Sequence, residues 1–458
     1  MKARRIISLL MASLLLGVCF MACEQGGNEE ATTAEEPSQD VNTEVPTTEE
    51  VTAEEETTRG TVNNAPIGDI RPYEIYDLNT YMSPVWDGRV VYNETVMFVG
   101  MNDQAALLYT PDEILSVRSY GLETVYEQGK DYDVVDGKLV LLEGTRIPVI
   151  SFEEYYYENE IPGKSAQLVT KYDGKDYYTY WGEGITMTQW QIAVTYVHDQ
   201  YWEGFVPETS DQFAKLIAKL EKGEDVTMVF YGDSITYGAN ASGLYEISPC
   251  APSYTQMFTH YLAQKYGYTV KYINTELRGT CPPPEDDTVF GANGTITYIN
   301  TAVGGWTSGN GYNNFDKYVK PYVEQYGCDF FLLAFGMNDP DNSPSFEKAT
   351  TKAIADKIYA IAPETELLLV ATMIPNPEAT NGWYGNQYKF EDILAELAKN
   401  YVDAGKSCAV AKMTSMSQRI LENKRFRDHT GNNINHPNDF LGRLYAQVVY
   451  ETVIGYDK

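Results

Sequence analysis

Hydrophobic and polar residues alternate in short runs between residues 67 and 208, which is typical of half-buried strands. The clearest runs cover residues 90–99, 131–135, 138–142, 166–171, 176–181 and 188–197. The dipeptide Asp-Gly, which favours hairpin turns, stands beside such runs at 87–88, 136–137 and 173–174. No long amphipathic helix interrupts the pattern. Residues 67–209 are therefore predicted to form an antiparallel β-sandwich domain.

From about residue 210 the pattern changes to an alternation of helices and strands. Helices are predicted at residues 211–220, 253–266, 312–326, 346–361, 390–400 and 440–453, and strands at 226–231, 269–273, 295–300, 329–335, 367–373 and 409–413. This order predicts a parallel sheet covered by helices on both faces, a three-layer α/β/α domain over residues 210–458. In such a fold functional groups lie in loops at the carboxyl ends of the strands.

The first 22 residues have the pattern of a signal peptide. Lys2, Arg4 and Arg5 precede an apolar run over residues 6–22. The run ends Phe20-Met21-Ala22-Cys23, which resembles a bacterial lipobox with Cys23 as the lipidated residue, although Phe20 replaces the usual leucine. An ordinary signal peptide that contains Cys23, or is cleaved at Cys19, stays open as an alternative.

Residues 23–66 are rich in Glu and Thr, and from Glu24 on the stretch has no aromatic residue, so we expect a disordered acidic tether behind the anchor. The sequence thus predicts a protein on the bacterial cell surface, bound to the membrane only through its lipid.

The formal net charge of −31 argues against a nucleic acid as partner, because phosphates would be repelled. The cysteine spacing matches no zinc pattern, and we expect neither a metal nor a cofactor. Cys250 and Cys281 both fall in predicted loops and could pair, whereas Cys328 and Cys408 begin apolar strands and are expected to be buried thiols.

Four short motifs follow strand ends in the second domain. They are Gly232-Asp233-Ser234, residues 299–307 (INTAVGGWT), Gly336-Met337-Asn338-Asp339 and Asn435-His436-Pro437. Each is weak alone, since Gly-Asp-Ser also makes ordinary turns. Together and in this order they resemble the SGNH (GDSL-type) hydrolases, and the resemblance covers about residues 226–458. It implies a flavodoxin-like SGNH fold.

The resemblance also implies a role for each residue. Ser234 corresponds to the nucleophile and His436 to the general base, while the N–H groups of Ser234 and Gly305 and the amide of Asn338 correspond to the oxyanion hole. Ester hydrolysis needs such groups: a base that takes the hydroxyl proton, and donors aimed at the developing oxyanion. Of the other histidines, His429 is the second choice for the base.

One position departs from the family, which has aspartate three residues before the histidine where this chain has Asn433. Three explanations stay open. The enzyme works as a Ser-His dyad, with Asn433 or a backbone carbonyl orienting the ring; another acid, Asp428 or Asp439, substitutes; or the domain is no longer catalytic. We favour the dyad.

The predicted reaction is hydrolysis of a carboxylic ester through an acyl-enzyme. A sandwich before an SGNH domain is similar to two-domain carbohydrate esterases, which implies O-deacetylation of an extracellular carbohydrate. Trp306, Trp383 and Tyr384 are expected to border the cleft and are candidate platforms for sugar rings. Two alternatives are a lipase or lysophospholipase, and a catalytically decayed surface protein that binds glycans.

Overall fold

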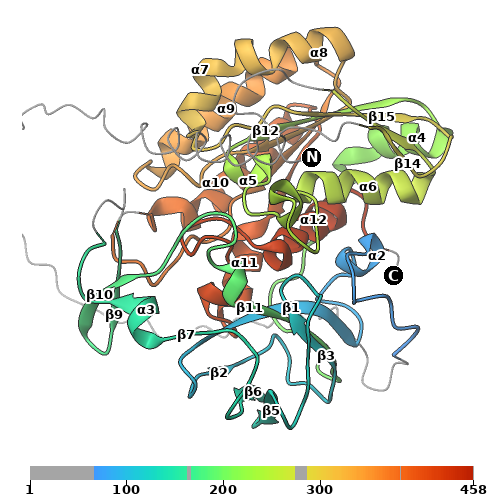
Figure 1. Ribbon diagram of the computed structural model, residues 1–458. Helices are drawn as coiled ribbons and strands as arrows, with labels where there is room; N and C mark the ends of the chain where they lie inside the picture. Colours follow the sequence, from blue (N-terminus) through green and yellow to red (C-terminus); the bar gives the residue numbers. More distant parts are fainter. Residues whose placement is uncertain (1–66, 162–166, 274–285, 382, 457–458) are drawn as a thin grey trace, which may run out of the picture.

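The computed structural model describes residues 67–161, 167–273, 286–381 and 383–456. The expected signal peptide, Cys23 and tether therefore lie outside the described residues, as does Cys281. The described chain has a β-rich part at the N-terminal side and a layered α/β part after it (Figure 1). The exact boundary at residue 209 stays a prediction.

Residues 67–209, here called the β-rich domain, form three small sheets. The largest has the order β4-β3-β11-β1-β7, and its centre is the antiparallel pair of β1 and β11. The two others have the orders β8-β10-β9 and β2-β6-β5. The strands are β1 (Val90–Val99), β2 (Gln104–Ala105), β3 (Glu113–Ser119), β4 (Val125–Tyr126), β5 (Tyr132–Val135), β6 (Lys138–Leu141), β7 (Val149–Ile150), β8 (Tyr156–Tyr157), β9 (Leu168–Tyr172), β10 (Lys175–Thr179) and β11 (Gln191–Val197), with short helices α2 (Leu78–Tyr81), α3 (Phe152–Tyr155) and η2 (Thr188–Trp190).

The second part is built on a seven-stranded sheet of order β14-β13-β15-β12-β16-β17-β18. All neighbours are parallel except β14, which runs antiparallel to β13. The strands are β12 (Val226–Gly232), β13 (Thr269–Tyr272), β14 (Thr288–Val289), β15 (Thr295–Asn300), β16 (Phe330–Ala334), β17 (Glu366–Ala371) and β18 (Cys408–Lys412). The predicted α/β domain with a mainly parallel sheet is confirmed, and so is a β-rich domain before it.

Helices cover both faces of this sheet. They are α4 (Ala214–Lys222), α5 (Ser234–Tyr237), α6 (Tyr254–Tyr266), α7 (Ser308–Tyr318), α8 (Lys320–Tyr326), α9 (Pro344–Ile361), α10 (Phe390–Asp403), α11 (Met413–Leu421) and α12 (Asp439–Val453), with the short η3 (Asp211–Phe213), η4 (Ser242–Tyr245), η5 (Asn386–Lys389) and η6 (Phe426–Asp428). The predicted helix over residues 312–326 is two helices, because Pro321 stands in the first turn of α8 and removes a backbone donor.

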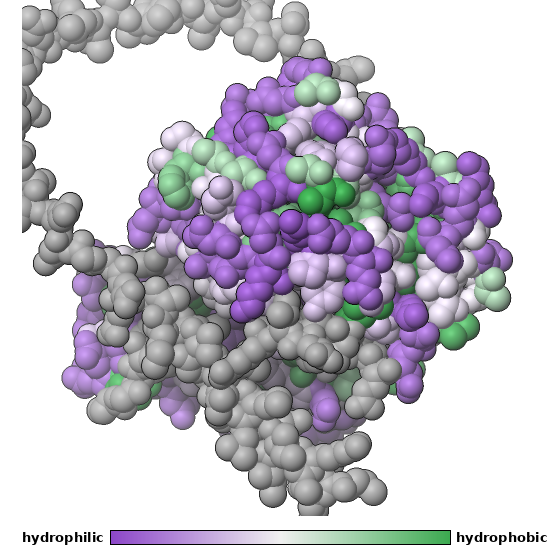
Figure 2. All heavy atoms as spheres, turned by 90° about the horizontal axis from the view of Figure 1, so that it is seen from above, coloured by the Kyte–Doolittle hydropathy of each residue, from purple (hydrophilic) through white to green (hydrophobic). Residues whose placement is uncertain are grey.

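Alternate residues of β12 point to opposite faces, as the pleat requires. Met228 and Phe230 pack with α4, α6, α11 and α12, whereas Val229 and Tyr231 pack with α7, α8, α9 and α10. The side seen in Figure 2, from above α7 and α9, is mostly hydrophilic with small apolar areas, as expected for the outer surface of amphipathic helices.

The first of these two cores continues into the β-rich domain. Val96, Phe98 and Val194 belong to the same cluster of buried side chains as Phe230 and Leu444. The two domains therefore share one hydrophobic core, which fixes the sheet of β1 and β11 against the C-terminal segment.

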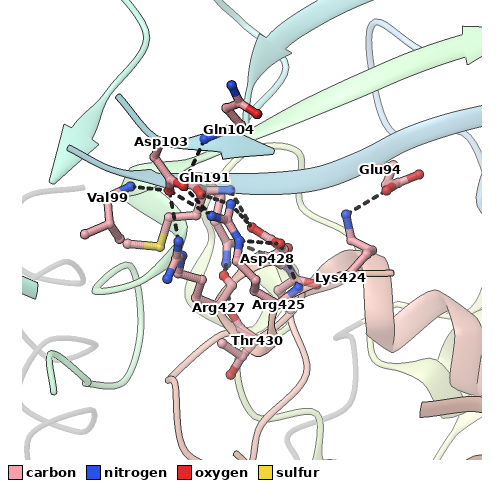
Figure 3. A network of polar contacts seen from close by, with 12 residues as sticks. Glu94, Val99, Asp103, Gln104, Gln191, Lys424, Arg425, Arg427, Asp428 and Thr430 are labelled. Carbon is pink, nitrogen blue, oxygen red and sulfur yellow. Dashed lines mark hydrogen bonds and ion pairs between the residues drawn. The ribbon is translucent and has the colours of Figure 1, made fainter. Parts of the chain in front are cut away.

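A polar network that joins the segment 424–438 to strand β1 reinforces this shared core (Figure 3). Lys424 forms an ion pair of 2.6 Å with Glu94, and both side chains are fully buried. Asp428 accepts a hydrogen bond of 2.9 Å from the backbone N–H of Met97. Arg425 and Arg427 both pair with Asp103, at 2.7 and 2.9 Å. Charges from one domain are thus neutralised by the other.

We expect the substitution Lys424→Met to lower the free energy of unfolding by about 3 kcal/mol, because it leaves the Glu94 carboxylate buried without its counter-charge. Urea denaturation followed by circular dichroism measures this. The control is Lys399→Met, which removes an exposed pair with Asp403 and should cost less than about 0.5 kcal/mol. Equal effects of the two substitutions would contradict the importance of the buried pair.

Candidate active site

The ends of three neighbouring strands are joined by backbone hydrogen bonds. Val303 donates to the carbonyl of Gly232 at 3.0 Å, and Asp233 donates to that of Ala334 at 3.3 Å. A side chain at Gly232 would lie 2.4 Å from the Ala334 carbonyl oxygen, so only glycine fits there. The loops after β12, β15 and β16 consequently lie at one edge of the sheet, and these loops carry Ser234, Gly305 and Asn338.

Ser234 is the first residue of α5, which Asp233 caps by accepting a hydrogen bond of 3.0 Å from the N–H of Ile235. The Ser234 hydroxyl lies 2.8 Å from Nε2 of His436. The exposed fractions are only 4% for Ser234 and 7% for His436, so the pair is largely shielded from water but still reaches the surface. The two residues that the sequence singled out for nucleophile and base thus meet.

The loop that carries His436 is organised by one side chain. The Oδ1 atom of Asn432 accepts hydrogen bonds from the backbone N–H groups of Ile434, Asn435 and His436, at 2.9 to 3.0 Å. Thr430 closes the loop, because its hydroxyl donates to the carbonyl of His436 at 2.9 Å. These hydrogen bonds hold the backbone that carries the imidazole.

The other ring nitrogen of His436, Nδ1, has two partners. Oε2 of Glu183 lies 3.0 Å away and Oδ1 of Asn240 lies 2.9 Å away. Both are acceptors, since Nδ2 of Asn240 is used to donate to the carbonyls of Gly431 and Gly184. Nδ1 therefore carries the proton, and Nε2 is left with a lone pair facing the Ser234 hydroxyl.

This arrangement corrects the predictions about the group that orients the ring. The side chain of Asn433 turns away from the ring and donates to the Tyr155 hydroxyl and the Tyr180 carbonyl, at 3.0 and 2.7 Å. Its backbone has φ of +64°, in the left-handed region.

Asp428 belongs to the arginine network described above. Asp439 accepts a hydrogen bond from the N–H of Ser242 at 2.9 Å, and His429 is buried beside Phe426 with a pKa lowered to about 3, chiefly by burial. None of these three contacts the ring of His436 in the described structure. Sequence reasoning missed Glu183 and Asn240, and no motif marks either of them.

Charges around the imidazole shift its pKa. Burial alone would lower the pKa of His436, but the Glu183 carboxylate, through its charge and hydrogen bond, and the charge of Asp233 raise it above the ordinary value. The pKa of Glu183 is lowered in turn: burial works against this, but the imidazolium charge and the hydrogen bonds from His436 and Asn432 outweigh it. Burial raises the pKa of Asp233 to about 7. The site therefore favours the protonated imidazole that forms when the serine loses its proton.

The expected oxyanion donors surround the serine loop. Gly305 has φ of +75°, a conformation that favours glycine, in the turn after β15. Asn338 donates through Nδ2 to the carbonyl of Trp306 at 3.0 Å, which ties the loops after β15 and β16 together and fixes its amide. Within the described residues, the N–H groups of Ser234 and Gly305 donate to no protein acceptor. They remain available to a ligand oxygen.

The three aromatic candidates differ in exposure. Trp306 packs edge-on against the rings of Tyr231 and Tyr318, with centroids 6.4 and 4.7 Å away. Trp383 packs beside a small apolar cluster made of Leu168, Trp181, Ala379 and Ile434.

Tyr384 is 42% exposed, and so is Tyr388, whose ring stacks on it at 6.1 Å. The loop with both tyrosines is anchored to the Asn338 loop, because Asn386 donates to the Pro340 carbonyl. Tyr384 is thus the most exposed of the three candidates.

Other features bear on cofactors and cysteines. Among the described residues, no group of three or more His, Cys, Asp or Glu side chains could hold a metal ion, and no helix is long and apolar enough to cross a membrane. Cys408 is buried and Cys328 half-buried, and burial raises the pKa of each thiol to about 12. Cys250 is exposed, and its expected pairing with Cys281 lies outside the described residues.

A serine whose hydroxyl faces a buried histidine, at the carboxyl edge of a parallel sheet, is an arrangement typical of α/β serine hydrolases. Residues 230–440 match the model of the GDSL-like Lipase/Acylhydrolase family. The match agrees with the resemblance that the sequence motifs predicted, and it supports a hydrolase that acts on esters. No curated protein matches the chain by sequence.

Solved structures show distant likeness. A two-domain esterase active on acetylated mannans is 18% identical, with 54% of each chain covered and a TM-score of 0.37. The acetylxylan esterase Axe2 from Geobacillus stearothermophilus is 14% identical, with 52% of this chain and 97% of that chain covered and a TM-score of 0.35. A putative GDSL-like lipase from Parabacteroides merdae ATCC 43184 is 14% identical, with 50% and 95% covered and a TM-score of 0.34. At these TM-scores the likeness carries no argument about substrate.

Proposed function

We propose that this protein is a serine esterase that removes acyl groups, most simply acetyl groups, from an extracellular carbohydrate. The observation that carries the proposal is the contact of 2.8 Å between the Ser234 hydroxyl and Nε2 of His436. A hydroxyl next to an unprotonated imidazole nitrogen is the arrangement that activates serine for attack on an ester carbonyl.

The reaction follows from the geometry. As Ser234 Oγ bonds to the carbonyl carbon, its proton passes to His436 Nε2. The negative oxygen of the tetrahedral intermediate accepts hydrogen bonds from the N–H groups of Ser234 and Gly305 and from Nδ2 of Asn338, and each such donor is worth about 3 kcal/mol. The imidazolium then gives its proton to the leaving alcohol oxygen, which leaves an acyl-enzyme. Water, deprotonated by His436, releases the acid and regenerates the serine.

One observation favours a carbohydrate substrate. Beside the Asn338 loop, the exposed rings of Tyr384 and Tyr388 offer flat apolar surface of the kind on which a sugar ring stacks.

We expect a protein consisting of residues 61–458 to release acetate from 4-nitrophenyl acetate and from acetylated xylan. The rate of release should fall by at least 10³-fold in Ser234→Ala, because the nucleophile is gone. Assays with 4-nitrophenyl palmitate and a lysophospholipid test the lipase alternative. Faster release of long acyl chains than of acetate would overturn the proposed substrate class. Absence of turnover on all four substrates would favour the decayed, glycan-binding alternative.

We also propose that the protein is lipid-anchored on the bacterial surface through Cys23, on the strength of the lipobox-like residues 20–23 and the acidic tether after them. Expressed in a bacterium fed with labelled palmitate, the full chain should carry the label in the membrane fraction. The variant Cys23→Ser should lose the label, whereas Cys19→Ser should keep it. A membrane-bound but unlabelled protein would contradict the lipid anchor.

A further inference from the structure

Glu183 reaches the active site from the β-rich domain, in the loop after β10. Both carboxylate oxygens are used: Oε2 accepts from Nδ1 of His436 at 3.0 Å, and Oε1 accepts from Nδ2 of Asn432 at 2.9 Å. Asn432 is the residue that organises the histidine loop. The carboxylate therefore touches both the imidazole and the side chain that holds its backbone.

The loop around Glu183 is built to hold it in this place. Gly182 donates its N–H to the carbonyl of Asn432 at 3.2 Å, so the backbone is docked directly on the histidine loop. The Thr186 hydroxyl donates to the carbonyl of Glu183 at 2.7 Å. A side chain at Gly182 would come within 2.8 Å of the Thr186 methyl group, so Thr186 would have to shift. The Glu183 side chain is 25% exposed, so water screens its charge only in part.

The residue at the family's usual acid position cannot take this role. The side-chain amide of Asn433 donates to the Tyr155 hydroxyl and the Tyr180 carbonyl, and these partners also belong to the β-rich domain. Position 433 has thus become a docking residue, and the carboxylate beside the ring comes from position 183 instead.

We propose that Glu183 is the acidic positioning residue of the active site, so that the β-rich domain completes a Ser234–His436–Glu183 triad. This inference rests on the proposed esterase function and assigns a further residue to it. When His436 takes the serine proton, the ring becomes positively charged, and the Glu183 carboxylate stabilises that charge at Nδ1. Asn240 accepts from the same N–H and helps to hold the tautomer.

The predicted pH dependence follows from the groups that face the ring. These are Glu183, in the loop after β10, and Asp233, at the end of β12, and both are acidic. Hydrolysis requires neutral His436 and therefore rises with pH through the pKa of the ring. Glu183 raises that pKa, so removing its charge moves the acidic limb of the kcat/KM profile to lower pH.

The test compares Glu183→Gln with the unmutated chain over pH 5 to 9. The expected result is a fall in kcat of about 10 to 10²-fold with an acidic limb at lower pH. The loss is smaller than the roughly 10⁴-fold of an aspartate-to-asparagine change in a Ser-His-Asp protease, because Asn240 still holds the tautomer. Adding Asn240→Gly, which suits the φ of +63° at that position, should bring the loss to about 10⁴-fold. Glu183→Asp, which keeps the charge, should move the limb less than Glu183→Gln.

The matched control is Glu160→Gln, a glutamate of the same domain that accepts a hydrogen bond from the Tyr178 hydroxyl, and it should leave the limb and kcat unchanged. Melting temperatures show whether each variant is folded. A folded Glu183→Gln with unchanged kcat and an unchanged acidic limb would overturn the proposal.

A second readout separates this proposal from the proposed function. A fluorophosphonate probe reacts when Ser234 Oγ bonds to phosphorus, fluoride leaves and His436 takes the proton. If no ester is turned over but labelling depends on pH and shifts in Glu183→Gln, the esterase assignment fails and the role of Glu183 stands. Labelling with the same pH dependence in both proteins would reject the role of Glu183.

Discussion

The docking of residues 424–438 on the β-rich domain is the constraint on which the rest of the active site depends. This segment carries His436, but it is a loop and cannot fix a side chain through regular secondary structure. Its charges are neutralised across the interface, by Glu94 against Lys424 and by Asp103 against Arg425 (Figure 3). Buried charges without these partners would be costly, so packing against the β-rich domain stabilises the conformation of this segment.

The two domains consequently contribute different parts of the active site. The parallel sheet holds the nucleophile and the oxyanion donors, because strand ends joined by backbone hydrogen bonds give a rigid edge. The base sits on the docked loop, and the β-rich domain presents Glu183 to it. On this account the N-terminal domain is a structural part of the esterase, in addition to any contact it makes with substrate.

The sequence was sufficient to predict where the residues that follow strand ends would lie. A buried run followed by glycine and a polar residue predicts the edge of a parallel sheet, and this located Ser234, Gly305 and Asn338 in one place. The histidine was found through its motif. These inferences use local patterns, which reflect backbone geometry directly.

Contacts between domains left no local pattern. Glu183 lies 253 residues before His436, and nothing near it differs from an ordinary turn. The spacing from the histidine pointed to Asn433 instead, because it was the one local signal for an orienting group. The exposure of Trp306, Trp383 and Tyr384 also depends on packing between distant segments. The break between α7 and α8 was also missed, although Pro321 is a local signal for it.

The central claim is that a carboxylate of the β-rich domain holds the imidazole proton at Nδ1 of His436. Proton NMR of the low-field region tests it most directly, with Ser234→Ala as a protein that keeps the pair. We predict a hydrogen-bonded Nδ1 proton far downfield of the amide signals, absent from a His436→Ala spectrum and shifted upfield in Ser234→Ala/Glu183→Gln. A signal that is the same with and without Glu183 would contradict the claim.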